Sequence, residues 1–270
     1  AQYHPQFVAE FGGEMTGPQA RYVQQVGQNI AVQSGLATTP GAFTVTLLNS
    51  SVNNAFAVPG GYVYATRQLV TLMNNEAELA AVLGHEVGHV AARHSARRQA
   101  AAQRNQLGGV GLAILSQVLL GNSELGNTIA QSALQGSQML TLSYSRNQEL
   151  EADQLGIQYL QRAGYDPRAM AGLLTSLARQ TQLDAQLQGR GDATIPAWAS
   201  THPDPASRVQ NALQLAGNGT GVTNRETFLS RIDGLIYGDD PEQGVIEGNA
   251  FIHPELRLTF TAPQGFYMIN

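Results

Sequence analysis

The sequence predicts an α+β fold that is mostly helical and contains one small antiparallel sheet. Residues 18–34 repeat apolar side chains at helical spacing, whereas residues 43–66 hold three short strand-like runs. Later segments open with helix-capping residues and continue at helical length. A chain of 270 residues that is 43% hydrophobic can bury a core for one main domain and a small second one.

A helix and three strands are expected near the start of the chain. The helix spans residues 18–34, and its apolar stripe consists of Tyr22, Val23, Val26 and Ile30. A strand follows at residues 43–48. The runs 52–58 and 62–66 flank the turn sequence Pro59-Gly60-Gly61, so they predict a hairpin.

Four further helices follow from capping signals. Asn75 is a suitable N-cap for a helix of roughly 28 residues. Ser145 opens a second helix, which is expected to stop at Gly164. Asp166-Pro167 and Asp204-Pro205 each place an N-cap before a proline at the first helical position, so a helix is expected to begin at each.

The sequence Gly217-Asn218-Gly219-Thr220-Gly221 has the composition of a linker. We therefore expect a main domain over residues 1–216 and a small α+β unit over residues 222–270. In that unit, residues 225–235 predict a helix and residues 251–261 alternate as strands do. No tandem helical repeat is visible in the sequence.

The sequence His85-Glu86-Val87-Gly88-His89 predicts a zinc site. A helix brings residues four apart onto one face, so both imidazoles can bind one ion. Glu86 is one residue along, where its carboxylate can take a proton from a water at the metal. In the alternative, a buried helix whose histidines are satisfied by hydrogen bonds, the carboxylate between two imidazoles has no explanation.

A catalytic zinc site needs a third protein ligand and leaves a fourth position for water. A site that continued along the same helix would have glycine and histidine at the positions of Ala92 and Ser95. His94 is one residue out of phase with that pattern. The third ligand is therefore expected from another helix.

The acidic helix that begins after Ser145 offers this ligand. Glu149 and Asp153 are four residues apart and share a face, and Gly156 continues that face with no side chain, which allows close helix packing. We expect Glu149 to be the third ligand and Asp153 to accept a hydrogen bond from a zinc-bound imidazole. Glu151 points elsewhere and is expected to be solvated; the alternative for the whole cluster is a charged helix face.

Four sequence blocks, in this order, resemble the zinc metalloproteases of the CAAX prenyl protease type, in particular their soluble bacterial envelope branch. The blocks are residues 54–64, 85–89, 149–153 and 201–208. The resemblance implies a zincin-like domain with one zinc ion per chain and supports Glu149 as a ligand. It also implies that His202 and Arg208 lie at the mouth of the metal site.

Two roles are open for His202. Its imidazole could donate to the oxyanion as the carbonyl is attacked, or it could occupy the fourth zinc position and keep the resting enzyme closed. We favour a gating contribution. Pro203 restrains the backbone of His202, so the ring can be held at a fixed place.

The function expected from the motif and the resemblance is a zinc-dependent endopeptidase that acts on unfolded or misfolded envelope proteins. The resemblance implies a periplasmic or otherwise exported protein, and because the numbering starts at Ala1 rather than at Met, we expect that a signal segment is absent from this chain through removal. The alternative is a quality-control binding module whose zinc site is closed or inactive. The sequence indicates no oligomeric state.

Composition excludes several other functions. The net charge is −5 and only 13% of the residues are charged, so nucleic acid is not an expected partner. All 15 cationic residues are arginines, which excludes lysine Schiff bases, and the absence of cysteine excludes thiolate ligands and nucleophiles.

No run of apolar residues reaches the roughly 18 to 20 needed to span a bilayer. Residues 107–121 are apolar but interrupted by glycines, and they predict a short helix covering the active-site side, with membrane-surface association as the alternative. The polypeptide substrate is expected to bind as an added strand along Val52–Val58. An ordinary hairpin without a substrate role is the alternative there.

Overall fold

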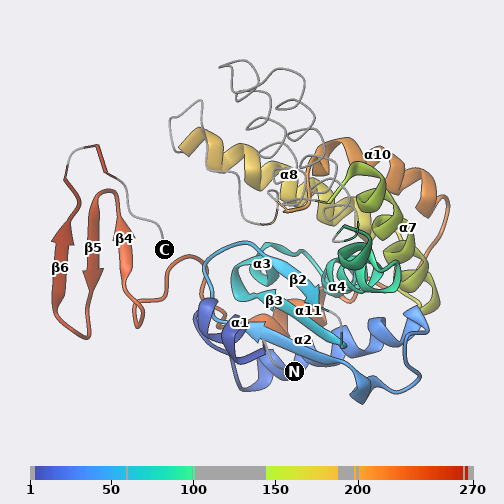
Figure 1. Ribbon diagram of the computed structural model, residues 1–270, viewed down its shortest axis with the longest axis horizontal. Coiled ribbons are helices and arrows are strands. Elements are labelled where there is room, and N and C mark those ends of the chain that lie inside the picture. The colour runs from blue at the N-terminus through green and yellow to red at the C-terminus, as the bar shows by residue number, and fades with distance from the viewer. Residues whose placement is uncertain are drawn as a thin grey trace, which may run out of the picture.

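The computed structural model describes residues 4–58, 60–98, 100, 144–187, 198, 201–263 and 265–266 (Figure 1). The helices are α1 (His4–Glu10), α2 (Pro18–Ala31), α3 (Arg67–Leu72), α4 (Glu76–Ala91), α7 (Arg146–Arg162), α8 (Ala169–Leu187), α10 (Pro205–Ala216) and α11 (Arg225–Ile232). The strands are β1 (Thr44–Leu48), β2 (Ala55–Val58), β3 (Tyr62–Thr66), β4 (Val245–Glu247), β5 (Ala250–His253) and β6 (Leu258–Thr261). The expected mostly helical α+β fold is confirmed.

The first sheet has the strand order β1-β3-β2. The hairpin prediction is confirmed, since β2 and β3 pair antiparallel with Val58 opposite Tyr62, although β2 begins at Ala55 rather than at residue 52. The sheet is mixed rather than purely antiparallel, because β1 runs parallel to β3. Beside β1, Glu14 forms a bridge with Leu48, so β2 offers the freer edge.

Helices cover both faces of this sheet. On one face α2 packs against β1 so closely that a methyl group on Gly27 would lie 2.7 Å from Val45. On the other face, α1 packs through Phe7, whose ring makes edge contacts with Phe56 and Tyr64. The side chains of β2 therefore alternate between the main core and the wall formed by α1.

The zinc-motif helix is shorter than expected. Asn75 caps α4 as predicted, because its side chain accepts a hydrogen bond from the Glu78 backbone at 3.0 Å. The predicted length of about 28 residues is wrong, since α4 ends at Ala91 after 16 residues. Arg93 adopts a left-handed conformation with φ of 54°, which breaks the helix before helical structure resumes at His94.

Helix α7 lies directly against α4 along a seam of glycines. A methyl group on Gly156 would come within 3.2 Å of the His85 backbone nitrogen, and one on Gly88 within 3.1 Å of the Ala152 carbonyl oxygen. The expected close approach at Gly156 is therefore confirmed. It places the acidic face of α7 beside the histidines of α4.

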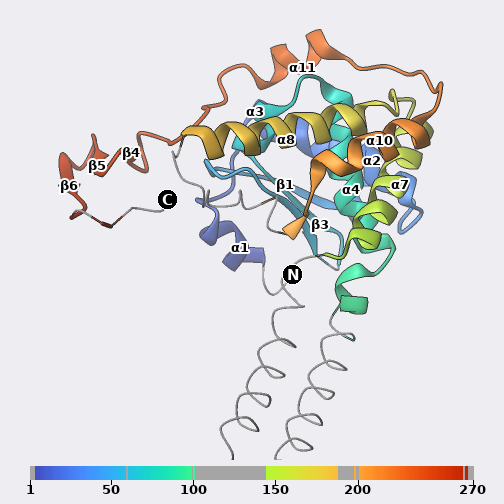
Figure 2. The same cartoon turned by 90° about the horizontal axis from the view of Figure 1, so that it is seen from above.

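The helix starts after α4 follow their capping signals in two of three cases. Ser145 and Gln148 form the predicted capping box of α7, and Asp204 caps α10. The predicted start of a helix at Pro167 is wrong, because α8 begins at Ala169. The Asp166 carboxylate binds Arg168 instead, and the intervening residues form a turn. Helix α10 packs against both α7 and α8, as seen from above in Figure 2.

The C-terminal segment has two parts. Helix α11 packs against α2, with Phe228 fully buried and its ring centroid 6.4 Å from that of Tyr22. Strands β4, β5 and β6 form an antiparallel sheet that lies apart from the other elements (Figure 1). The division of the chain into domains at 1–216 and 222–270 stays a prediction.

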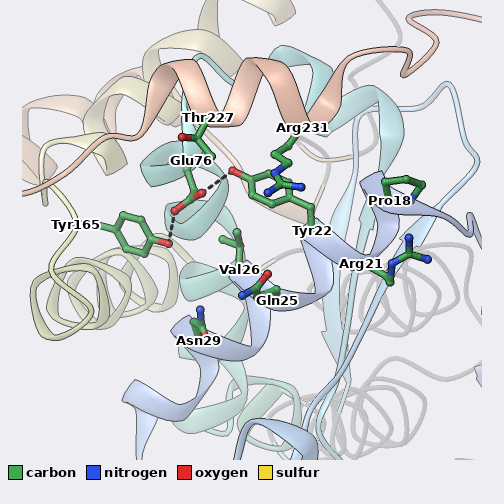
Figure 3. Close-up of a pocket in the computed structure, with 10 residues that line it drawn as sticks. All are labelled: Pro18, Arg21, Tyr22, Gln25, Val26, Asn29, Glu76, Tyr165, Thr227 and Arg231. Carbon is green, nitrogen blue, oxygen red and sulfur yellow. Dashed lines mark hydrogen bonds between the residues drawn. The ribbon is translucent and has the colours of Figure 1, made fainter.

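Glu76, the first residue of α4, ties this helix to three other segments. Its carboxylate accepts hydrogen bonds from Tyr22 at 2.6 Å, Tyr165 at 2.8 Å and Asn224 at 2.9 Å. The carboxylate lies at a cavity of about 470 Å³ between α2 and α11 (Figure 3). The zinc-motif helix is thus fixed at its start, on the side away from the histidines.

In the described part of the chain, no helix is long and apolar enough to cross a membrane. The apolar residues 107–121, with the alternative of membrane-surface association, lie outside the described residues.

Candidate metal centre

Two helices bring the predicted ligands together. His85 and His89 lie on one face of α4, and both are buried, with their Nε2 atoms 3.0 Å apart. Across the glycine seam, α7 presents Glu149, whose Oε1 lies 3.4 Å from His89 Nε2 and whose Oε2 lies 3.6 Å from His85 Nε2. The third-ligand candidate inferred from helix geometry therefore faces both imidazoles.

His202 completes a group of four. Its Nδ1 atom lies 3.3 Å from His85 Nε2 and 3.1 Å from Glu149 Oε1. The candidate ligand atoms of the four buried side chains lie within 4.8 Å of one another. Tetrahedral ligands at about 2.0–2.1 Å from zinc are separated by roughly 3.3 Å, so the spacing fits a zinc ion.

The hydrogen bond behind His85 shows why a cation belongs here. Asp153 Oδ1 lies 2.9 Å from His85 Nδ1, so this nitrogen donates, and in the neutral ring Nε2 then carries the lone pair. That lone pair faces a carboxylate oxygen of Glu149. Two acceptors that face each other in a buried site repel unless a cation lies between them, so the donor set fits a metal ion.

Arg208 holds both acidic side chains in place. From α10, its guanidinium donates to Glu149 Oε2 and to Asp153, with Nε 2.8 Å from Oδ2. Burial would raise the pKa of Asp153, but the hydrogen bonds from Arg208 outweigh this and lower it. Both carboxylates are therefore kept ionised, as metal binding requires.

The pKa values of His85 and His89 are shifted in opposite directions. Burial lowers the pKa of His89 to about 2, so its ring is neutral. Burial also lowers the pKa of His85, but the hydrogen bond to Asp153 and the charge of Glu149 outweigh it and raise this pKa. The site therefore favours positive charge beside His85, which a divalent ion would supply in place of a proton.

Glu86 lies next to the ligand group without joining it. Its carboxylate is buried, and Oε1 has no hydrogen-bond partner among the described residues; His202 Nε2 lies 3.5 Å from it. Burial raises the pKa of Glu86. A carboxylate of this kind, beside a metal site and short of a partner, is suited to accept a proton from water.

A cavity of about 340 Å³ opens beside Glu86 and His202. Helix α1 and strand β2 form one wall, and the other wall is formed by residues near the candidate metal ligands. Its lining includes Phe7, Phe11, Phe56, Ala57, Arg98, Tyr144 and Thr201. The metal group, which we define as His85, His89, Glu149 and His202, therefore borders a cleft that runs along the edge of β2.

Three neighbours of the site were not found from the sequence. Tyr144 stacks on His89 with ring centroids 3.9 Å apart, and Trp198 stacks on His202 at 4.8 Å. His94, which is out of phase with a motif that continues along one helix, lies against His89. Tyr144 and Trp198 are distant from the zinc motif in the sequence, so no local pattern signals these contacts, and the break after α4 has no sequence signal either.

Replacing Asp153 by Asn is expected to weaken zinc binding by roughly 10- to 100-fold, because the acceptor behind His85 loses its charge. Zinc competition with a chromophoric chelator measures the change. Asp166→Asn, which removes the charge of a carboxylate that pairs with Arg168 and not with a histidine, serves as the control. Equal zinc affinities for the two variants would exclude this role for Asp153.

Comparison with known families gives a match over most of the chain. Residues 18–216 match the model of peptidase family M48. The chain is 36% identical over 199 residues to the β-barrel assembly-enhancing protease of Yersinia pestis, covering 73% of this chain and 38% of that protein. It is 34% identical over 200 residues to the protein of the same name in Escherichia coli K12, with the same coverage of both chains.

A mitochondrial relative matches as well. Identity to the mitochondrial metalloendopeptidase OMA1 of Schizosaccharomyces pombe is 30% over 210 residues, which is 77% of this chain and 57% of that protein. The chain thus spans little more than a third of the bacterial relatives and somewhat over half of this one.

Proposed function

The chain belongs to peptidase family M48, so its site is that of a metalloendopeptidase, and we propose that it hydrolyses peptide bonds of unfolded or misfolded envelope proteins with one zinc ion. The observation that carries this proposal is the convergence of His85, His89 and Glu149 beside the buried carboxylate of Glu86, whose Oε1 accepts no hydrogen bond from the described residues. We also propose a periplasmic or otherwise exported location, because two bacterial relatives are named as proteases that enhance β-barrel assembly.

Each residue of the group has a role in this reaction. His85, His89 and Glu149 would hold the zinc, which when bound polarises a carbonyl and makes water more acidic. Glu86 takes the proton from the attacking water and returns it to the leaving amine. Arg208 and Asp153 fix the ligands.

A protein offered in folded and unfolded forms tests the substrate class. We expect cleavage of the unfolded form only. A chelator should abolish this cleavage, and added zinc should restore it. Equal cleavage of the two forms would contradict the proposed preference. Zinc binding without any cleavage would favour the alternative, a binding module with a closed site.

We propose that His202 closes the resting site. Its Nδ1 lies among the ligand atoms of His85 and Glu149, while its Nε2 faces Glu86. A ring in this place can occupy the fourth zinc position and keep water from Glu86. The position of His202 therefore also supports a protease whose active site is closed at rest over one whose active site is always open.

Replacing His202 by Ala is therefore expected to increase the cleavage rate of an unfolded protein and to leave the zinc content unchanged. A rate that falls by roughly 10²-fold would instead indicate that the imidazole donates to the oxyanion. Rate and zinc content, measured on the same preparation, separate these roles. An unchanged rate would contradict both.

The substrate is proposed to extend the sheet at β2. Thr66 N–H donates to Asn54 O, and hydrogen-bonded pairs alternate along an antiparallel ladder, so Ala55 and Ala57 direct their N–H and C=O groups away from β3. These groups lie on the side of β2 that can accept another strand. The cleft lined by Ala57 and Glu86 passes along this edge.

Replacing Ala57 by Pro removes one outward N–H and is tolerated best at a strand edge. Loss of one peptide hydrogen bond is expected to raise KM by roughly 2- to 10-fold with little change in kcat. Ala57→Ser keeps the N–H and is the control. Equal KM values for the two variants would show that the substrate does not pair with this edge.

A further inference from the structure

A fourth histidine, His94, lies behind the candidate metal ligand His89. The Nδ1 atom of His94 is 2.8 Å from Nδ1 of His89, and the His94 side chain is fully buried. His94 does not belong to the group of four that can share a metal ion. It therefore contacts a ligand from the side that faces away from the metal.

The proton positions in this contact follow from Glu151. Its Oε2 lies 3.1 Å from His94 Nε2, and a carboxylate only accepts, so Nε2 of His94 carries the proton. In the neutral ring, Nδ1 of His94 is then an acceptor, and His89 must donate to it from Nδ1. The lone pair of His89 is left on Nε2, 3.0 Å from His85 Nε2 and facing the ligand group.

The break after α4 makes this contact possible. On a continuous helix, His94 would lie five residues beyond His89 and roughly 140° around the axis. The left-handed conformation of Arg93, with φ of 54°, turns the chain so that His94 points back to His89. The backbone adopts an uncommon conformation for a residue other than glycine at the point that places His94.

The two zinc-motif histidines are thus supported in different ways. His85 is backed by the buried carboxylate of Asp153. His89 is backed by an imidazole, which is held by Glu151 at the surface, where Arg97 pairs with it at 3.0 Å. The side chain of Glu151 is 42% exposed, so it contacts solvent as predicted, but it also binds the buried His94.

We propose that His94, oriented by Glu151, is a positioning residue that fixes the tautomer and ring orientation of His89 for metal binding. The inference rests on the metal site of the proposed function but not on peptide hydrolysis. Outer partners of this kind typically change metal affinity by roughly 10- to 100-fold when removed. His94 is not one of the four candidate ligands and does not line the cleft, but it contacts the ligand His89, so its effect passes through that ring.

The test compares zinc affinity across four variants in competition with a chelator. His94→Phe keeps an aromatic ring but no acceptor, and we expect the zinc dissociation constant to rise by roughly 10- to 100-fold. His94→Asn offers an amide oxygen near the lost Nδ1 and is expected to recover part of this loss. Glu151→Ala should fall between wild type and His94→Phe.

Arg97→Ala is the matched control, since it removes the exposed ion pair and leaves Glu151 free to hold His94. Its zinc affinity is expected to stay within about twofold of wild type, because exposed pairs contribute little. Thermal melts of the metal-free variants show whether each one folds. If His94→Phe does not fold, the zinc affinity of Glu151→Ala still tests the proposal, because we expect it to be lower than that of the wild type.

Nitrogen-15 spectra of the metal-free protein at a pH of about 8, where free histidines are neutral, report the tautomers directly. We expect the proton on Nδ1 of His89 and on Nε2 of His94, and a mixture of His89 tautomers in His94→Phe. A folded His94→Phe with wild-type zinc affinity, or His89 protonated on Nε2 in the wild type, would overturn the proposal. Absence of peptide hydrolysis would overturn the proposed function alone, since neither readout here depends on cleavage.

Discussion

Replacing Glu86 by Gln is expected to leave about one zinc ion per chain and to lower peptide hydrolysis by roughly 10²- to 10⁴-fold. Glu86 is outside the group of ligand atoms, so the amide should not disturb metal binding. The amide cannot accept the proton of the attacking water. Zinc content and the initial cleavage rate of an unfolded protein, measured on the same sample, check both parts.

The pH dependence of hydrolysis by the wild type provides a second test of the role of Glu86. Burial raises the pKa of Glu86, so its carboxylate is protonated, and hydrolysis is lost, at a higher pH than for an ordinary glutamate of pKa about 4.3. The residual rate of Glu86→Gln should lack this acid limb. Glu10→Gln, at the far wall of the same cleft, is the control and should keep the wild-type profile. Loss of zinc from Glu86→Gln would contradict its role as a base.

Replacing Glu149 by Ala is expected to remove the zinc under mild chelation and to abolish hydrolysis. Only His85 and His89 remain of the three proposed ligands, so the loss of affinity should exceed the roughly 10- to 100-fold typical of an outer partner. Arg208 also loses one of its two carboxylates. Metal analysis after dialysis against the chelator measures the effect.

Two variants control this experiment. Glu226→Ala, on the exposed surface of α11, should keep its zinc and its activity. Glu149→Gln keeps the shape of the side chain and should still lose most of the metal, because its amide is a weaker ligand than a carboxylate. If Glu149→Ala kept full zinc and activity while Glu151→Ala did not, the wrong carboxylate would have been assigned.

Most of the ligand geometry was predictable because it depends on local helix spacing. Residues four apart share a helical face, which placed His85 with His89 and Glu149 with Asp153. Gly156 allowed a non-local prediction, namely that α7 packs closely against α4, because a residue without a side chain permits two helices to approach closely. The cap at Ser145 fixed the start of the helix that presents the carboxylates.

The remaining features depend on backbone conformations and long-range pairings that the sequence does not encode in a local pattern. His94 was missed because its position follows from a left-handed Arg93, and arginine carries no signal for that conformation. The parallel pairing of β1 with β3 joins segments whose order in the sheet has no local signature. The position of His202 was predictable only from the family resemblance, because it depends on a long-range hydrogen bond from the Trp198 N–H to the Asn53 carbonyl oxygen.

Titration of zinc into the chelator-stripped chain, with cleavage of an unfolded protein recorded at each addition, tests the central claim most directly. The claim is that one ion held by His85, His89 and Glu149 makes this chain a peptidase. We expect no cleavage before zinc is added and a linear rise that ends at one equivalent per chain. Full cleavage by the stripped chain, or a rise that does not end at one equivalent, would contradict it.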